Sequence, residues 1–167
     1  MKKIFLLLLV ISSLTACKKT VIQNHVYDNV IYDVGKTAVY QSAAQKTRQK
    51  TTTQFISILY SDLFQSAIPN NQLNDLSILY LANGDKNMIT EMLVSNYMNT
   101  TGVKLPSNTD MRADVDKFIN NTYIHFYLRY PTSYELYYLK NMIQNDANIT
   151  PELVYSSFVL SDEYWFY

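Results

Sequence analysis

The chain has 167 residues, with 14 basic and 14 acidic side chains and a formal net charge of zero. This balance, without a clustered basic stripe, argues against nucleic acid as a partner. Cys17 is the single cysteine, which excludes intramolecular disulfides and the haem, iron–sulfur and zinc sites that need several cysteines. The 15 tyrosines accompany only 3 glycines and 4 prolines, and this composition predicts an all-α fold with a single helical domain.

Residues 1–16 have the order of an export signal, in which basic residues precede an apolar run. Lys2 and Lys3 come before the run from Ile4 to Leu14. As a helix, such a run covers roughly 16 Å, about half of a bilayer core near 30 Å, so a permanent transmembrane helix is not expected.

The run ends in Leu14, Thr15, Ala16 and Cys17, which resemble the lipobox of bacterial lipoproteins. The resemblance implies that the signal is cut before Cys17, that Cys17 is acylated, and that the lipid bilayer is a partner through the acyl chains. It also implies the outer membrane, with the domain facing the periplasm, because Lys18 stands where an Asp would retain a lipoprotein at the inner membrane. Surface display stays open, although the acidic tract that accompanies it in some groups is absent. The alternative is an ordinary signal peptide with an incidental cysteine.

Residues 17–53 are expected to form a lipid-anchored helical segment and a linker. Apolar residues at every fourth position predict an amphipathic helix, namely Ile22, Val26, Val30 and Val34. Gly35 is its expected end. The polar stretch 41–53, which includes Lys46 and Lys50, is interpreted as a solvated helix end or linker.

Residues 54–167 are expected to form the helical domain. Apolar spacings of three and four predict three helices in its first half. The first starts at Phe55 and is ended by Pro69, the second carries the apolar residues from Leu73 to Tyr80, and the third covers 86–98. We expect Asn70 or Asn71 to cap the second of these helices, and Gly84 to end it in the left-handed conformation.

The second half of the domain carries stronger helix start patterns. A helix is predicted over 111–130, before Pro131. Thr132 followed by Glu135 forms a capping-box pattern. Thr150 before Pro151 favours a last helix, because Thr is a good cap and Pro suits the first helical position.

The two halves align with each other. Phe55 falls opposite Phe118 and Leu76 opposite Leu139 at an offset of 63, while Thr90 falls opposite Thr150 at an offset of 60. This pattern predicts a duplicated three-helix unit, with repeats 55–98 and 118–164. The alternative is a chance alignment of two amphipathic stretches.

The second repeat contains two short motifs, Arg129 with Pro131, Thr132 and Glu135, and the run 161–164. They resemble helical modules of exported bacterial proteins and phycobilisome-linker-like domains, where an Arg, Pro, Glu turn and a terminal Ser, x, Glu, Tyr recur. Leu128 stands where those modules usually have Gly. The resemblance brings no catalytic residue and implies an interaction module.

Few residues have metal-binding spacing. His25 and Asp28 could supply two ligands from one helix, but no third ligand is spaced to join them. Asp110, Asp114 and Asp116 lack the Gly and the closing Glu of a calcium loop, and they better suit a helix amino terminus. We therefore predict no metal and no cofactor.

Acid–base chemistry is the other catalytic candidate. A glycosidase-like pair could be drawn from four acids, Glu135, Glu152, Asp162 and Glu163, although solvated surface acids are the better interpretation. His125 could be a general base, but no Gly-x-Ser-x-Gly motif accompanies it, and a hydrogen-bonded histidine at the core boundary explains it better. We assign no catalytic residue.

Aromatic residues crowd the last third of the chain. They form the main candidate contact surface, namely Tyr134, Tyr137, Tyr138, Tyr164, Trp165 and Tyr167. Core and boundary packing is the alternative. The aromatic run at the end is expected to dock on its own domain or on a partner, because exposed aromatic clusters favour association.

These patterns predict a membrane-tethered cell-envelope lipoprotein with a binding or structural role, whose partner is an envelope protein or a glycan. The alternative is an envelope enzyme that acts on glycan or peptide. A concave pocket joining His125 to a carboxylate and a nucleophile would indicate the enzyme, and a flat or grooved aromatic surface would indicate the binding module.

Overall fold

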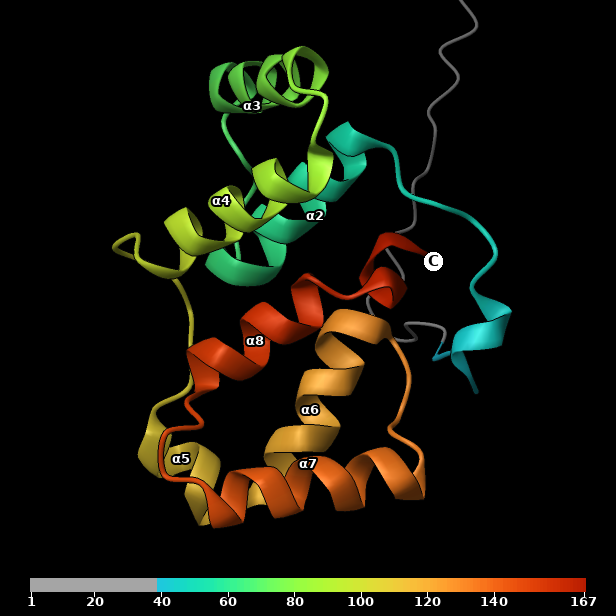
Figure 1. Cartoon of the computed structure of the whole chain (residues 1–167), viewed down its shortest axis with the longest axis vertical. Coiled ribbons are helices and arrows are strands. Elements are labelled where there is room, and N and C mark those ends of the chain that lie inside the picture. The colour runs from blue at the N-terminus through green and yellow to red at the C-terminus, as the bar shows by residue number, and fades with distance from the viewer. Residues whose placement is uncertain (1–38) are drawn as a thin grey trace, which may run out of the picture. The chain divides into compact units, whose positions relative to one another are not determined.

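A computed structural model describes residues 39–167 (Figure 1). The export signal, Cys17, the His25 and Asp28 pair and the helix expected before Gly35 lie outside the described residues. The described part consists of helices and loops with two isolated β-bridges, which confirms the all-α fold. Within this part, no helix combines the length and apolar character needed to span a membrane.

Three helices build the first half of the described part, α2 (Thr52–Phe64), α3 (Asn70–Ala82) and α4 (Lys86–Met98). α2 begins with a capping box, in which Thr51 and Gln54 each accept a hydrogen bond from the other's backbone N–H. The Asp85 side chain caps α4 by accepting from the backbone N–H of Met88 at 3.0 Å.

Two predictions for α3 are wrong. Asn70 is its first helical residue and no side chain caps it, so neither Asn70 nor Asn71 acts as the cap. The helix ends at Asn83 in an extended conformation, and Gly84 is not left-handed. Asn83 explains this end, because its backbone N–H and its side-chain amide both donate to the carbonyl of Leu79, at 3.2 and 3.1 Å.

The second half contains α5 (Asn108–Ala113), α6 (Val115–Tyr127), α7 (Ser133–Asn145), α8 (Pro151–Val159) and the 3₁₀ helix η2 (Asp162–Trp165). The helix predicted over 111–130 is divided at Asp114, which caps α6 by accepting from the backbone N–H of Lys117. The capping box of Thr132 with Glu135 is confirmed, and so is the Thr150 cap before Pro151.

The helix boundaries repeat along the chain. α6 begins and ends 63 residues after α2, and α7 begins and ends 63 residues after α3. α2 and α6 also end alike, in left-handed residues at Gln65 (φ 54°) and Leu128 (φ 53°). The offset of 60 for the third helix is wrong, because Thr90 lies inside α4 whereas Thr150 caps α8.

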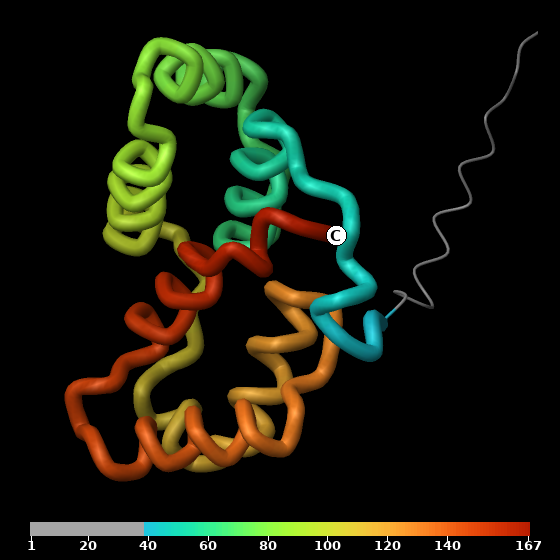
Figure 2. Tube along the Cα trace, turned by 45° about the vertical axis from the view of Figure 1, so that its right-hand side comes forward, coloured from blue at the N-terminus to red at the C-terminus, as the bar shows by residue number. Residues whose placement is uncertain are grey.

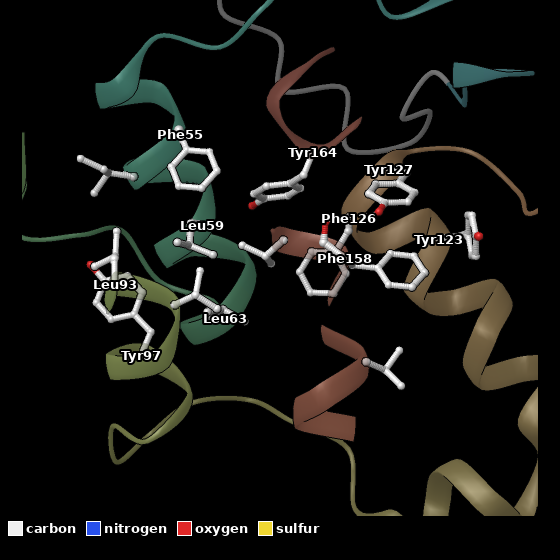
Figure 3. Packing of buried hydrophobic residues seen from close by; sticks show 14 of the residues in the cluster. Phe55, Leu59, Leu63, Leu93, Tyr97, Tyr123, Phe126, Tyr127, Phe158 and Tyr164 are labelled. Atoms are coloured by element: carbon white, nitrogen blue, oxygen red, sulfur yellow. Dashed lines mark hydrogen bonds between the residues drawn. The ribbon is translucent and has the colours of Figure 1, made fainter. Parts of the chain in front are cut away.

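A single hydrophobic core joins the two halves, and Tyr164 from η2 lies between them (Figure 3). The Tyr164 ring packs edge-on against Phe55 of α2 and Phe126 of α6, with centroids 5.6 and 5.9 Å apart. The Trp165 ring stacks on Phe55 at 3.9 Å. The aromatic end therefore docks on its own domain, which was one of the two outcomes expected from the sequence.

Residues 40–50 lie beside the last residues of the chain (Figure 2). Arg48 and Tyr167 exchange two backbone hydrogen bonds of 3.1 and 2.9 Å, and the backbone N–H of Lys50 donates to Trp165 at 2.8 Å. This stretch was expected to be solvated, yet Lys46 and Lys50 are buried. Their burial is tolerated because each ammonium group has polar or aromatic partners that replace water.

Candidate functional site

Arg129 lies at the centre of a buried ion cluster. Its side chain is 5% exposed and binds two glutamates at once. Nε and Nη2 each donate to Glu163 at 2.7 Å, while Nη1 and Nη2 donate to Glu135 at 2.9 and 2.8 Å. The guanidinium also lies over the rings of Tyr123 and Tyr127. Because the guanidinium donates two hydrogen bonds to each carboxylate, its charge is neutralised by the protein and needs little hydration.

Local structure places both glutamates. Glu135 belongs to the capping box of α7, where its Oε2 also accepts from the backbone N–H and the hydroxyl of Thr132 at 2.7 and 2.9 Å. Glu163 lies in η2 and pairs with Lys46 at 3.0 Å. The cluster therefore ties α7, η2 and the 40–50 segment to the end of α6.

Both glutamates are ionised at neutral pH. Hydrogen bonds from Arg129 lower the pKa of Glu135 to about 2. Burial acts to raise the pKa of Glu163, but hydrogen bonds from Arg129 and Lys46 outweigh it and lower that pKa. Neither carboxyl can then serve as a proton donor at neutral pH. The interpretation as solvated acids is wrong for these two and holds for Glu152 and Asp162, which are exposed.

A pocket of about 340 Å³ lies between residues 40–50, α2, α6 and the end of the chain. Aromatic rings supply much of its wall, and it also holds four side chains of basic or acidic character, Lys46, Lys50, Asp62 and His125. Clustered ionisable groups in a concave apolar site are a common mark of a binding site.

Lys50 is one of two buried lysines that line this pocket, the other being Lys46. The Nζ of Lys50 donates to the backbone carbonyl of Tyr164 and lies 3.9 Å from the centroid of the Tyr164 ring. Burial lowers the pKa of Lys50 to about 8, although the attraction of Asp62 opposes this shift. Among the described residues, no carboxylate forms an ion pair with Lys50.

Asp62 is the anionic group of the same pocket. Its Oδ2 accepts a hydrogen bond from the Tyr164 hydroxyl at 2.7 Å. Burial raises the pKa of Asp62, while the Tyr164 hydrogen bond and the nearby His125 and Lys50 oppose the rise. The Nε2 of His125 donates to the backbone carbonyl of Asp62 at 3.0 Å, so His125 is a hydrogen-bonded residue at the core boundary.

The pocket does not assemble a nucleophilic triad. His125 contacts the main chain of Asp62 rather than its carboxyl group. No Ser, Thr or Cys is among the described residues that line the pocket. The arrangement can bind and orient charged groups, and the lining offers no serine, threonine or cysteine as a nucleophile for acyl transfer.

The six aromatic residues expected to form one contact surface fall into two groups. Tyr134, Tyr137 and Tyr138 are exposed on α7, at 72%, 68% and 54%. Tyr164 is completely buried, so its assignment to an exposed surface is wrong. Trp165 and Tyr167 are half-buried beside residues 48–50. They serve the fold because their rings and backbone close the chain onto the domain.

Tyr134, Tyr137 and Tyr138 form an exposed aromatic surface on one side of α7, because residues three and four apart are neighbours on a helix. The rings of Tyr134 and Tyr138, one helical turn apart, have centroids 6.1 Å apart and planes that differ by 17°. A shallow cleft of about 330 Å³ lies beside Tyr138, and its lining includes the amides of Asn141 and Asn145. This α7 surface combines ring faces with two amides and with the exposed carboxylate of Asp146, which also lines the cleft.

The aspartates considered for calcium have structural roles. Asp110 completes the capping box of α5, Asp114 caps α6, and Asp116 pairs with Lys140 at 2.8 Å. Across residues 39–167, no group of three or more His, Cys, Asp or Glu side chains could hold a metal ion.

Sequence patterns did not point to Lys46, Lys50 or Asp62. Lys50 and Tyr164 are 114 residues apart in the chain, and Asp62 and Tyr164 are 102 apart. Such pairs leave no local spacing from which the pocket could be predicted.

Comparisons with protein-family models, curated proteins and solved structures find no match to this chain.

Proposed function

We propose that this chain is a membrane-tethered cell-envelope lipoprotein whose helical domain binds glycan through the α7 surface. The observation that carries the binding role is the near-parallel pair of exposed rings, Tyr134 and Tyr138, beside a cleft lined by amides. The tether is supported by the likeness of residues 14–17 to a lipobox, with Cys17 as the acylated residue.

The chemistry of the α7 surface favours a neutral glycan over a protein partner. Aromatic faces can stack on the C–H faces of sugar rings, and the amides of Asn141 and Asn145 can exchange hydrogen bonds with sugar hydroxyls. Two nearby charged groups are engaged, since Glu135 binds Arg129 and Lys140 binds Asp116. Asp146 in the cleft lining is exposed, and its carboxylate can accept hydrogen bonds from sugar hydroxyls. A ligand that is rich in hydroxyls and has no negative charge therefore suits this surface.

Glycan binding can be tested by cosedimentation with an insoluble uncharged glycan, for which chitin is the probe. We expect the wild-type chain to pellet with the glycan and the Tyr134→Ala, Tyr138→Ala double variant to lose at least about tenfold in affinity, because stacking area is removed. Leu81→Ala is the control, since Leu81 is an exposed apolar residue on α3. Pelleting of the double variant at wild-type affinity would contradict the proposal, as would crosslinking through these tyrosines to an envelope protein with no glycan bound.

The tether is tested separately. Because Cys17 is the only thiol, Cys17→Ala should abolish incorporation of a labelled fatty acid and release the chain from membranes or leave it unprocessed. Ser13→Ala, in the same signal segment, is the control and should label normally. Equal labelling of the Cys17 variant and the wild type would show that the lipobox assignment is wrong.

A further inference from the structure

The pocket beside α6 contains a cation and an anion that do not bind each other. Lys50 and Asp62 both line it, and each influences the pKa of the other, yet they are not within ion-pair distance. Tyr164 holds both of them, with its carbonyl on Lys50 and its hydroxyl on Asp62. The two opposite charges are therefore fixed at separate points of one cavity.

The other charged groups near the pocket are less available. Lys46 pairs with Glu163 at 3.0 Å, and its ammonium group lies over the Tyr127 ring at 4.9 Å. The Nε2 of His125 is occupied by a backbone carbonyl. Lys50 and Asp62 each contact Tyr164, but the ammonium group keeps two further N–H donors and the carboxylate keeps Oδ1. These two groups are therefore the charges that a ligand could engage.

The pocket also has apolar lining residues. Ile58 contributes from α2, Phe126 from α6 and Phe166 from the end of the chain. A cavity of about 340 Å³ is at the small end of the range for small-molecule sites, about 300 to 1,000 Å³. It suits one small molecule with an apolar body.

We propose that this pocket binds a small zwitterion of the amino-acid type, with its carboxylate on Lys50, its ammonium group on Asp62 and an apolar side chain among the aromatic walls. A simple anion would meet the carboxylate of Asp62, and a simple cation would meet the ammonium group of Lys50. A ligand with both charges gains both attractions and avoids both repulsions. Loss of solvent around a buried charge makes each correctly placed partner more valuable.

The full chain purified in detergent can be titrated with L-phenylalanine by calorimetry. We expect saturable 1:1 binding. Two analogues each remove one charge: 3-phenylpropionate lacks the ammonium group and phenethylamine lacks the carboxylate. Each should bind at least about tenfold more weakly, since one charge-assisted contact is lost and one buried charge is left without its partner. Equal affinity for phenylalanine and either analogue would overturn the proposal, as would absence of phenylalanine binding.

Variants test the two charged residues. Lys50→Met and Asp62→Asn should each weaken phenylalanine binding at least about tenfold, whereas Lys104→Met, at an exposed lysine, should bind as the wild type does. Because Lys50 and Asp62 also contact Tyr164, the Lys50→Met and Asp62→Asn variants could lose binding by unfolding. A third variant therefore tests the pocket without changing either charge. Ile58→Trp narrows the pocket without touching either charge and should abolish binding. Normal binding by Ile58→Trp, or by folded Lys50→Met, would overturn the proposal.

Discussion

Arg129 contacts glutamates from both α7 and η2, and each of these carboxylates would lose its main partner if the guanidinium were removed. We expect Arg129→Met to lower the free energy of unfolding by about 3 to 5 kcal/mol, because breaking a buried ion cluster leaves charge uncompensated. Denaturant titration measures this loss. Lys140→Met is the matched control, since the Lys140–Asp116 pair is 39% and 49% exposed and such pairs contribute at most about 1 kcal/mol. Equal losses in the two variants would contradict the importance of Arg129.

The same cluster predicts how stability depends on pH. Hydrogen bonds from Arg129 lower the pKa of Glu135 from 4.5 to about 2, so the folded chain binds this proton more weakly than the unfolded chain. The group contributes stability that is present above about pH 4.5 and is lost as the pH falls toward 2. The Tm of the wild type should therefore fall more steeply through this window than that of Glu135→Gln. Parallel curves for the two proteins would rule out this linkage.

Gln65 ends α2 at φ 54°, a left-handed conformation that favours glycine. Its side chain is exposed, so replacement removes little packing. We expect Gln65→Gly to raise the free energy of unfolding by about 1 kcal/mol, because glycine adopts this conformation without a Cβ clash. Gln65→Ala keeps the Cβ and should give no such gain. Thermal unfolding compares the two variants, and a destabilised Gln65→Gly would refute the strain argument.

At the scale of elements, the last three residues close the domain. Deleting 165–167 removes the Trp165 stack on Phe55 and the backbone hydrogen bonds to Arg48 and Lys50. We expect a loss of at least about 3 kcal/mol, the scale of removing one buried aromatic side chain, and a lower Tm by circular dichroism. Trp165→Phe keeps an aromatic ring and the backbone bonds and should cost much less. An unchanged Tm after the deletion would mean that this closure is not needed for stability.

Local sequence predicted the elements better than their ends. Thr132 and Thr150 were predicted as caps because a cap depends on residues two or three positions away. Gly84 was misassigned because Asn83 closes α3 without a left-handed residue. The left-handed end at Leu128 could not be predicted from residue type, since leucine rarely adopts that conformation.

At the scale of the whole described unit, the pair α2 and α3 and the pair α6 and α7 have helices of the same length at an offset of 63 residues. Tyr164, from the end of the chain, packs between α2 and α6. Asp62 and His125, 63 residues apart, occupy equivalent places near the ends of α2 and α6, and they contact each other. The alignment of the halves can be predicted because several apolar positions recur at one offset, such as Phe55 with Phe118 and Leu76 with Leu139. The pocket could not be predicted from the sequence, because it depends on how the two halves pack together and on residues 40–50. The polar composition of residues 40–50 predicts exposure to solvent when only neighbours in the chain are considered.

The contact of Lys50 with Tyr164 spans 114 residues, and this separation affects the order in which the chain can fold. A ribosome or an export channel delivers a chain from its amino end, so residues 40–50 emerge long before their partners. Until residues 163–167 follow, Lys46 and Lys50 remain in water and the place of Tyr164 between α2 and α6 stays empty. The helices can form early from local contacts, but the closing contacts have high sequence separation and must come last. A chain truncated before Tyr164 would then expose the apolar side chains of α2 and α6 that Tyr164 covers, a feature that chaperones and proteases can use to distinguish unfinished molecules from complete ones.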